Sequence, residues 1–190
     1  MWQYKIGVQE YLTLRQREEN ATAFYYFFKS RGATIQAICG VLGNITQESQ
    51  LNPGVKQTSS PSSGIGLIQW TPSTVLTNWC TMMGYNWWDG NAQCERIWSE
   101  GTNTNGAGGT WIPTSEYPYS WDEFLKLTDA HESMYAYLKE RERAGNEAIQ
   151  NRINATDEWL MFFNTNPPPP TPVTRRRKKL PVYMMVSRRF

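Results

Sequence analysis

The sequence is poor in the side chains on which several classes of enzyme depend. It has three cysteines and one histidine among 190 residues. Three cysteines cannot all pair into disulfides, and no two of Cys39, Cys80 and Cys94 have the spacing of metal ligands. His131 is the one residue that could act as the base of a Ser-His or Cys-His pair. We expect free, mostly buried thiols, no metal and no other cofactor.

Long apolar runs are absent as well. Residues 1–20 are polar and charged and lack the apolar stretch of a secretory signal peptide. No segment reaches the roughly 20 consecutive apolar residues that a membrane-spanning helix needs. We therefore predict neither a signal peptide nor a membrane span.

Acidic residues are missing from two parts of the chain. There is no Asp or Glu from Ser49 through Trp88, and residues 167–190 hold seven Lys or Arg and no acid. Residues 1–166 contain twelve basic and seventeen acidic residues, so this part has a net negative charge. Domains that bind nucleic acids are usually basic, so we do not expect nucleic-acid binding by residues 1–166.

Apolar and aromatic residues are plentiful. Hydrophobic residues make up 39% of the chain and aromatic residues 14%, including nine Trp. This composition is typical of one globular domain with a real core. The aromatic residues suit a large core, which is the more common use, or an aromatic-walled groove. Because four prolines at 167–170 must end a helix, we predict a domain at 1–166 and a Pro-rich linker with a basic tail at 167–190.

Hydrophobic spacing predicts a mainly helical domain. The expected helices are residues 17–31, 34–49, 73–84, 91–100, 128–142 and 156–164. Thr34, Thr128 and Thr156 are the expected N-caps of three of them. Gly40 and Gly43 lie inside the second helix, where each costs about 1 kcal/mol relative to Ala, so we expect another backbone to pack closely there. Residues 65–70 suit a short strand or hairpin inserted between helices.

One carboxylate stands out, at the end of the second helix. Glu48 lies about 120° from the middle of that helix's apolar stripe, shortly before a loop that contains Pro53 and Gly54. A carboxyl half sheltered by apolar groups resists ionisation, as a general acid requires. A negative charge at the carboxyl end of a helix also opposes the helix dipole. The alternative interpretation is an ordinary solvated Glu at a helix end.

A second segment, residues 64–71 (GIGLIQWT), contains groups that could hold a sugar. Gly66 lets a backbone approach a ligand closely. The Gln69 amide can donate and accept hydrogen bonds, and Trp70 offers a flat face for stacking. A Gly-rich strand edge that ends in a core Trp would fit the same sequence.

Together the two segments resemble a known family. Glu48-Ser49, followed after a loop by Gly-Leu-Ile-Gln at 66–69, is similar to the core of goose-type lysozymes and soluble lytic transglycosylases. The closer resemblance is to the phage tail lysozymes, the lysozyme-like domains of tail-tip proteins with which short-tailed phages breach the host wall. It lies in QAICGVLGNITQES at 36–49, LNPG at 51–54 and GIGLIQWTP at 64–72.

The resemblance is strong over residues 34–72 and looser over about 20–165. It implies a lysozyme-like fold, mainly α with a small β part, in which a cleft separates two helical lobes. It also implies that the protein cuts the glycan strands of peptidoglycan, with Glu48 as proton donor, and that it is carried on the tail of a phage virion. The substrate-binding residues that it implies are Ser49, Gly66, Gln69 and Trp70.

A second catalytic carboxylate, which most glycosidases have, is not apparent. The acid-free stretch from Ser49 to Trp88 excludes one on the insertion beside Glu48. Glu142, in a late Glu-Arg pair that resembles the family's, is expected to form a structural salt bridge. Any base must then come from Asp89, Asp122, Glu123, Asp129 or Glu132. Two reactions stay open: hydrolysis, which the resemblance favours, and the lytic transglycosylase reaction.

Other functions also stay open. The fold could serve a non-catalytic structural component of a tail, or an enzyme of host lysis at the end of infection. Five consecutive basic residues at 175–179 are more typical of a docking segment than of nucleic-acid binding. We expect this tail to dock on other phage tail proteins or on anionic wall polymers.

Overall fold

The computed structural model of the chain describes residues 1–142 and 148–169. Within them the fold is mainly helical, as predicted, and its sheet is one pair of two-residue strands. In chain order the elements are β1 (Gly7–Val8), α1 (Leu14–Lys29), α2 (Ile35–Ser49), β2 (Val55–Lys56), α3 (Thr74–Met83), α4 (Gly90–Thr102), α5 (Trp121–Phe124), α6 (Ala130–Tyr137), a π-helical turn (Leu138–Glu142) and α7 (Ile149–Thr165). The basic residues at 175–179 lie outside the described residues.

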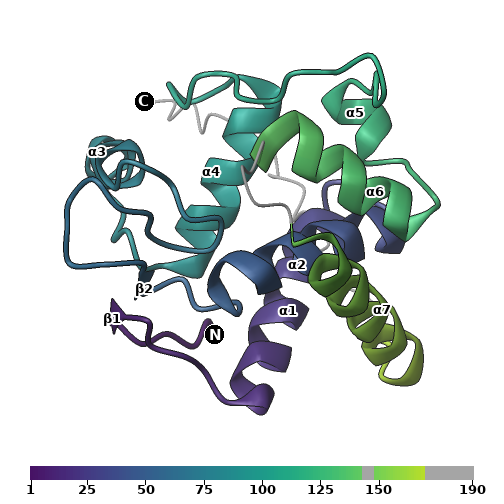
Figure 1. Ribbon diagram of the computed structural model, residues 1–190, viewed down its shortest axis with the longest axis horizontal. Coiled ribbons are helices and arrows are strands. Elements are labelled where there is room, and N and C mark those ends of the chain that lie inside the picture. The colour runs from purple at the N-terminus through teal and green to yellow at the C-terminus, as the bar shows by residue number, and fades with distance from the viewer. Residues whose placement is uncertain (143–147, 170–190) are drawn as a thin grey trace, which may run out of the picture.

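The elements form two groups. In Figure 1, α3, β1 and β2 lie on one side of α4, whereas α5, α6 and α7 lie on the other. Helix α2 runs between these groups and packs against both α6 and α7. This arrangement agrees with the two-lobed helical fold that we expected.

Two glycines of α2 lie where other backbones approach. A Cβ on Gly40 would be 2.6 Å from the backbone nitrogen of Met134 in α6, and a Cβ on Gly43 would be 2.1 Å from Oγ1 of Thr156 in α7. The close packing predicted from these glycines is therefore confirmed. The predicted N-cap is confirmed as well, since Thr34 Oγ1 accepts a 3.0 Å hydrogen bond from the backbone N–H of Ala37.

Three predicted helix boundaries were wrong. Helix α1 begins at Leu14 rather than residue 17, and the N-cap of α6 is Asp129 rather than Thr128. Helix α7 begins at Ile149, so Thr156 is buried inside it and its hydroxyl donates to the Arg152 carbonyl. The start of α7 escaped prediction because polar residues dominate its first two turns, which hides the apolar spacing of a packed helix.

The insertion after α2 contains the expected hairpin in a very short form. Ile65 and Trp70 pair as an antiparallel bridge with hydrogen bonds of 3.3 and 3.0 Å. Gly66 and Gln69 both adopt left-handed backbone conformations, with φ of 76° and 51°, which lets the chain reverse within a few residues.

Residues 1–13, which we call the N-terminal segment, run along this insertion. β1 pairs in parallel with β2. Two fully buried amides fasten the segment: Asn20 accepts a hydrogen bond from Gln3 N–H, and Asn52 donates to the carbonyls of Lys5 and Glu10. No pattern in the sequence indicated the position of this segment.

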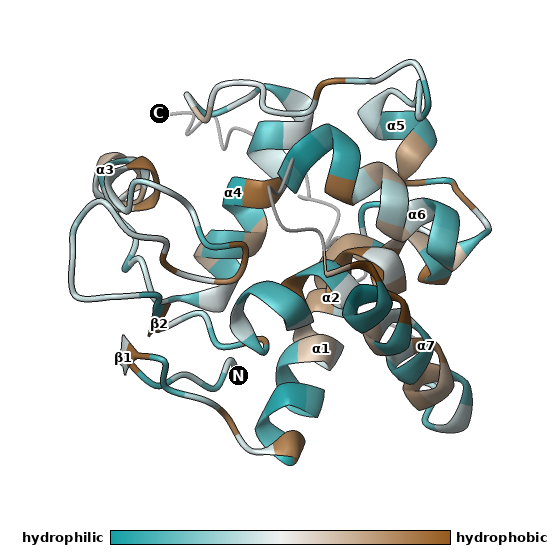
Figure 2. Ribbon diagram, viewed as in Figure 1, coloured by the Kyte–Doolittle hydropathy of each residue, from teal (hydrophilic) through white to brown (hydrophobic). Residues whose placement is uncertain are grey.

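Most of the aromatic residues belong to the core, which was the expected use. The rings of Phe24 and Phe28 stack with centroids 4.4 Å apart, and Trp121, Phe124 and Tyr137 extend the cluster. Figure 2 shows that α2 changes from hydrophobic to hydrophilic toward its carboxyl end. That hydrophilic end is where the helix leaves the core.

The three cysteines are buried and form no disulfide, as predicted. Burial raises the pKa of the Cys39 thiol to about 12 and that of Cys80 to about 11. These thiols therefore stay protonated, and unreactive as nucleophiles, at neutral pH.

Candidate active site

A cleft of about 1090 Å³ opens at the carboxyl end of α2. Its lining includes the last turn of α2, the hairpin after β2, the N-terminal segment, the end of the π-helical turn and the start of α7, with single residues from other elements such as Glu100 of α4. Of the five predicted site residues, Glu48, Ser49, Gln69 and Trp70 line this cleft.

Gly66 does not line the cleft. A Cβ on this residue would lie 2.8 Å from the side-chain oxygen of Gln93, which bonds the backbone N–H of Leu67. Its positive φ is a further reason for glycine. We expected a ligand to approach the backbone at Gly66. The group that approaches it is the side-chain amide of Gln93.

Glu48 lies in a charged environment and not in the apolar shelter that we expected. Its side chain is 20% exposed, and its Oε1 accepts a 2.6 Å hydrogen bond from Nη2 of Arg152 in α7. Arg152 is 1% exposed and also donates to the side-chain oxygen of Asn44. No local pattern could reveal this pairing, because 104 residues separate the two partners.

The other predicted residues at the cleft differ in how far they are exposed and in what their side chains contact. Ser49 is buried and its hydroxyl donates to the Ile45 carbonyl within the helix. Trp70 is 3% exposed, so its ring is part of the wall and core and cannot be the open stacking face that we expected. Gln69 is half-buried at the cleft, where its amide nitrogen donates to the Gly66 carbonyl.

A buried cluster of charged side chains surrounds Glu100 in the wall of the cleft. No motif in the sequence predicted this cluster. The Glu100 carboxylate accepts hydrogen bonds from the Trp70 indole and Arg96 through one oxygen and from Arg141 through the other. Glu100 is 1% exposed. Four charge-assisted or indole hydrogen bonds fully satisfy this carboxylate, so we assign it a structural role.

Glu142 was expected to form a structural salt bridge as part of a Glu-Arg pair, whose Arg143 lies outside the described residues. It lines the cleft, and among the described residues it forms no salt bridge of the kind we expected. Its Oε1 is closed to solvent and has no hydrogen-bond partner in this part of the chain. Burial raises the pKa of Glu142 to about 8, against the effect of Arg141 and with a further upward contribution from Glu48.

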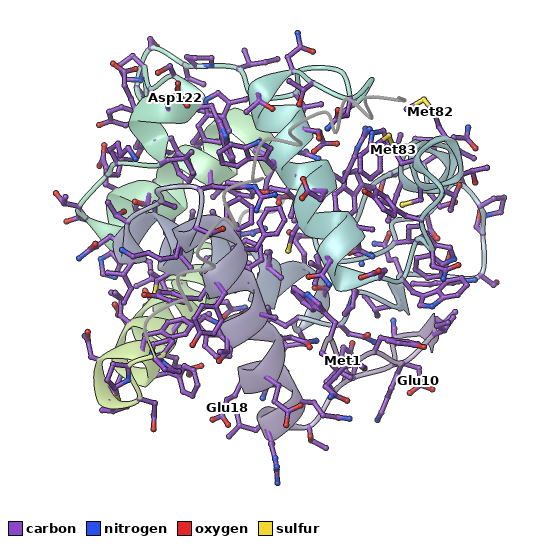
Figure 3. The ribbon with its side chains drawn as sticks, turned by 180° about the vertical axis from the view of Figure 1, so that it is seen from behind. Met1, Glu10, Glu18, Met82, Met83 and Asp122 are labelled. Carbon is purple, nitrogen blue, oxygen red and sulfur yellow. The ribbon has the colours of Figure 1, made fainter. Side chains whose placement is uncertain are left out.

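None of the five bases proposed from the sequence lines the cleft. Asp89 and Asp129 cap α4 and α6, and Glu123 closes a capping box with Ser120. Glu132 accepts a hydrogen bond from the Tyr119 hydroxyl. Figure 3 shows Asp122 at the opposite end of the molecule from Glu10, whose neighbours Gln9 and Tyr11 line the cleft. All five carboxylates therefore lie outside the lining of the cleft.

The cleft is rich in amides. Its lining includes five glutamines, namely Gln9, Gln47, Gln50, Gln57 and Gln69. An amide side chain donates and accepts hydrogen bonds, which suits hydroxyl and acetamido groups. Tyr11 of the N-terminal segment is 55% exposed at the rim, and it is the open aromatic ring that Trp70 was expected to be.

Comparison with known proteins shows the family of the chain. Residues 19–163 match the family model described as phage tail lysozyme. The chain belongs to the phage tail lysozyme family. One relative, morphogenesis protein 1 of Bacillus phage B103, is 33% identical over 153 residues, which are 78% of this chain and 40% of that protein. The chain thus spans less than half the length of this relative.

Membership of the phage tail lysozyme family confirms the resemblance seen in the sequence, and the helical fold is the lysozyme-like one expected from it. The family match begins at residue 19. Gln9, Tyr11, Leu12 and Arg17 line the cleft but precede the match, so one wall of the cleft lies outside the part shared with the family model.

Among residues 1–142 and 148–169, no group of three or more His, Cys, Asp or Glu side chains is placed to hold a metal ion. None of the described helices has the length and apolar character needed to cross a bilayer.

Proposed function

We propose that this protein cuts the glycan strands of peptidoglycan, with Glu48 as the carboxyl that protonates the leaving sugar oxygen. One observation carries the proposal: in a chain of the phage tail lysozyme family, Glu48 projects from the end of α2 into a cleft of about 1090 Å³. A pocket of this size suits several sugar residues of a polymer. The amides along the cleft would hold the hydroxyl and acetamido groups of the sugars.

Ser49, Gln69 and Trp70 have separate parts in this proposal. Gln69 would contact the sugar directly, while Trp70 and Ser49 would shape the wall beside Glu48. Gly66 would act through the tight turn that carries Gln69.

The manner of bond cleavage follows from the positions of the carboxylates. A covalent sugar–enzyme intermediate requires a second carboxylate about 5 Å from the first, and the insertion beside Glu48 has none. We favour hydrolysis, in which water attacks the sugar as Glu48 protonates the leaving oxygen. The alternative is attack by the 6-hydroxyl of the sugar itself, which produces the 1,6-anhydro end of a lytic transglycosylase.

Digestion of purified peptidoglycan tests the proposal. Mass spectrometry of the released muropeptides should show new reducing ends that carry an added water. Products lighter by one water would make the protein a lytic transglycosylase. A digest without new glycan ends would contradict both reactions and favour a non-catalytic component, a function suggested by the name of the morphogenesis protein of phage B103.

We further propose that the protein is carried on a phage tail and acts on the host wall at the start of infection. Residues 170–190, with the basic run, would dock it on tail proteins or anionic wall polymers. Deletion of residues 167–190 should leave the melting temperature and the cleavage of soluble glycan fragments nearly unchanged. Loss of the cooperative transition would place the domain boundary elsewhere.

A further inference from the structure

Three carboxylates line the cleft, and their surroundings differ. Glu100 accepts hydrogen bonds from Trp70, Arg96 and Arg141. Glu48 accepts one from Arg152. Glu142 has an oxygen that is closed to solvent and has no partner within residues 1–142 and 148–169. A carboxyl oxygen that is buried without a hydrogen-bond partner costs much free energy while the group is charged and much less while it is protonated.

The charged and titratable groups around Glu142 come from every element packed near it. They are Glu48 of α2, Glu100 of α4, Tyr137 of α6, Arg141 of the π-helical turn and Arg152 of α7. The two arginines already bond Glu100 and Glu48. Burial, with the nearby Glu48 charge, raises the pKa of Glu142 to about 8. Glu142 is therefore protonated at neutral pH, while Glu48 forms an ion pair with the guanidinium of Arg152.

The proposed proton donor is thus held in an ion pair with Arg152, and Glu142, which lines the same cleft, holds a proton. We propose that Glu142 stores the proton that Glu48 delivers to the glycosidic oxygen. The proposal rests on the glycan-cutting function above and adds a second member to its site. Because the Oε1 of Glu142 is closed to solvent, Glu142 acts through Glu48 and is a positioning residue.

The proton passes from Glu142 through Glu48 to the leaving oxygen and is then restored from water. When glycan fills the cleft, the Glu142 carboxyl gives its proton to the Glu48 carboxylate, and the Glu142 anion is stabilised by Arg141 and Arg152. Glu48 then protonates the leaving oxygen as the bond to the sugar breaks. Water supplies its hydroxide to the sugar and returns its proton to the pair, so hydrolysis consumes one water and no net proton.

Glu140 offers a matched control. It lies two residues before Glu142 on the same π-helical turn. It is fully buried, and burial raises its pKa to about 7. It does not line the cleft, and its Oε1 accepts a hydrogen bond from the Tyr119 N–H. A Glu140→Gln substitution thus removes a similar buried acid from the same element without touching the proposed pair.

The first test is the pH dependence of glycan cleavage by the wild type, Glu142→Gln and Glu140→Gln, each confirmed as folded by thermal melting. The wild type should keep its rate up to about pH 8. Glu142→Gln should be nearly as fast at pH 5, where protons in solution are plentiful. Its rate should then fall below that of the wild type as the pH rises toward 8, by up to about tenfold for each pH unit. Glu140→Gln should keep the wild-type profile.

An unchanged pH profile in Glu142→Gln would overturn the proposal, as would an equal shift in Glu140→Gln. Loss of all activity at every pH, including pH 5, would also overturn it, since Glu142 would then act on the sugar directly. These results differ from failure of the proposed function, in which the wild type itself would release no glycan ends.

A second measurement does not depend on activity. Infrared spectra of Glu140→Gln should show a protonated buried carboxyl at pH 7 that disappears with a midpoint near pH 8. The double variant, with Glu140→Gln and Glu142→Gln in one chain, should lack this band. Absence of such a band at pH 7 would show that Glu142 holds no proton to deliver.

Discussion

Arg152 donates a 2.6 Å hydrogen bond from Nη2 to Oε1 of Glu48, and this bond joins α7 to the end of α2. The guanidinium is 1% exposed and its Nη1 bonds Asn44 one turn earlier on α2. The same contact therefore fixes the direction of the Glu48 side chain and fastens α7 to the core. The proposed catalytic carboxyl depends on a helix that begins 100 residues later in the chain.

Replacement of Arg152 by Met should destabilise the fold by about 3–5 kcal/mol, because it removes one partner of a largely buried ion pair while keeping most of the side-chain volume. Urea denaturation measures the loss. Arg15→Met is the matched control, since the Arg15–Glu19 pair is exposed and should contribute little. Equal stability of the two variants would contradict a structural role for the Arg152 pair.

Gly43→Ala should destabilise the fold by about 1–3 kcal/mol, the usual cost of an added methyl group in a packed core. Its Cβ would meet Oγ1 of Thr156 at 2.1 Å and the Arg152 carbonyl at 2.8 Å. Gln36→Ala, at a partly exposed position of the same helix, should change stability by less than about 0.5 kcal/mol. If Gly43→Ala were as harmless in urea denaturation, α2 and α7 would not pack as closely as described.

Stability should fall as the pH rises from about 4.5 to 7. Burial raises the pKa of Glu140 from its ordinary value of 4.5 to about 7, so the folded state keeps a proton that the unfolded chain has lost in this range. The loss is on the order of 3 kcal/mol at pH 8 and absent below pH 4. Glu142, whose pKa is raised to about 8, acts in the same direction, so denaturation curves at several pH values should show that Glu140→Gln removes only the part of this dependence that belongs to Glu140. An identical pH dependence in the wild type and the variant would place the ionisation elsewhere.

Local signals were sufficient for α2 and for the residue at its end. The Thr34 cap, the apolar spacing and the glycines each acted within a few residues, so the helix, its close neighbours and the position of Glu48 in the cleft could all be predicted. The same holds for the tight turn that carries Gln69, where two glycines and a short apolar run indicated a hairpin.

The environment of the site could not be predicted, because it depends on contacts between distant residues. Arg152 reaches Glu48 across 104 residues, and the amide of Asn52 holds the N-terminal segment across 42 to 47. Trp70 could equally serve as a sugar platform or a core residue, and only the packing around Glu100 decided for the core. Glu142 was expected to form a structural salt bridge, and no local pattern indicated its place in the wall of the cleft, near Glu48 and Arg152.

The measurement that tests the central claim most directly is the rate at which Glu48→Gln cuts purified peptidoglycan. The amide can still accept the hydrogen bond from Arg152, so the variant should fold, with a lower melting temperature because the buried guanidinium loses its charged partner. Its cleavage rate should fall at least about 100-fold at every pH, because an amide cannot donate the proton. Glu95→Gln, which breaks the partly exposed pair with Arg31 away from the cleft, should keep the wild-type rate. A folded Glu48→Gln protein that releases glycan ends at nearly the wild-type rate would contradict the assignment of Glu48.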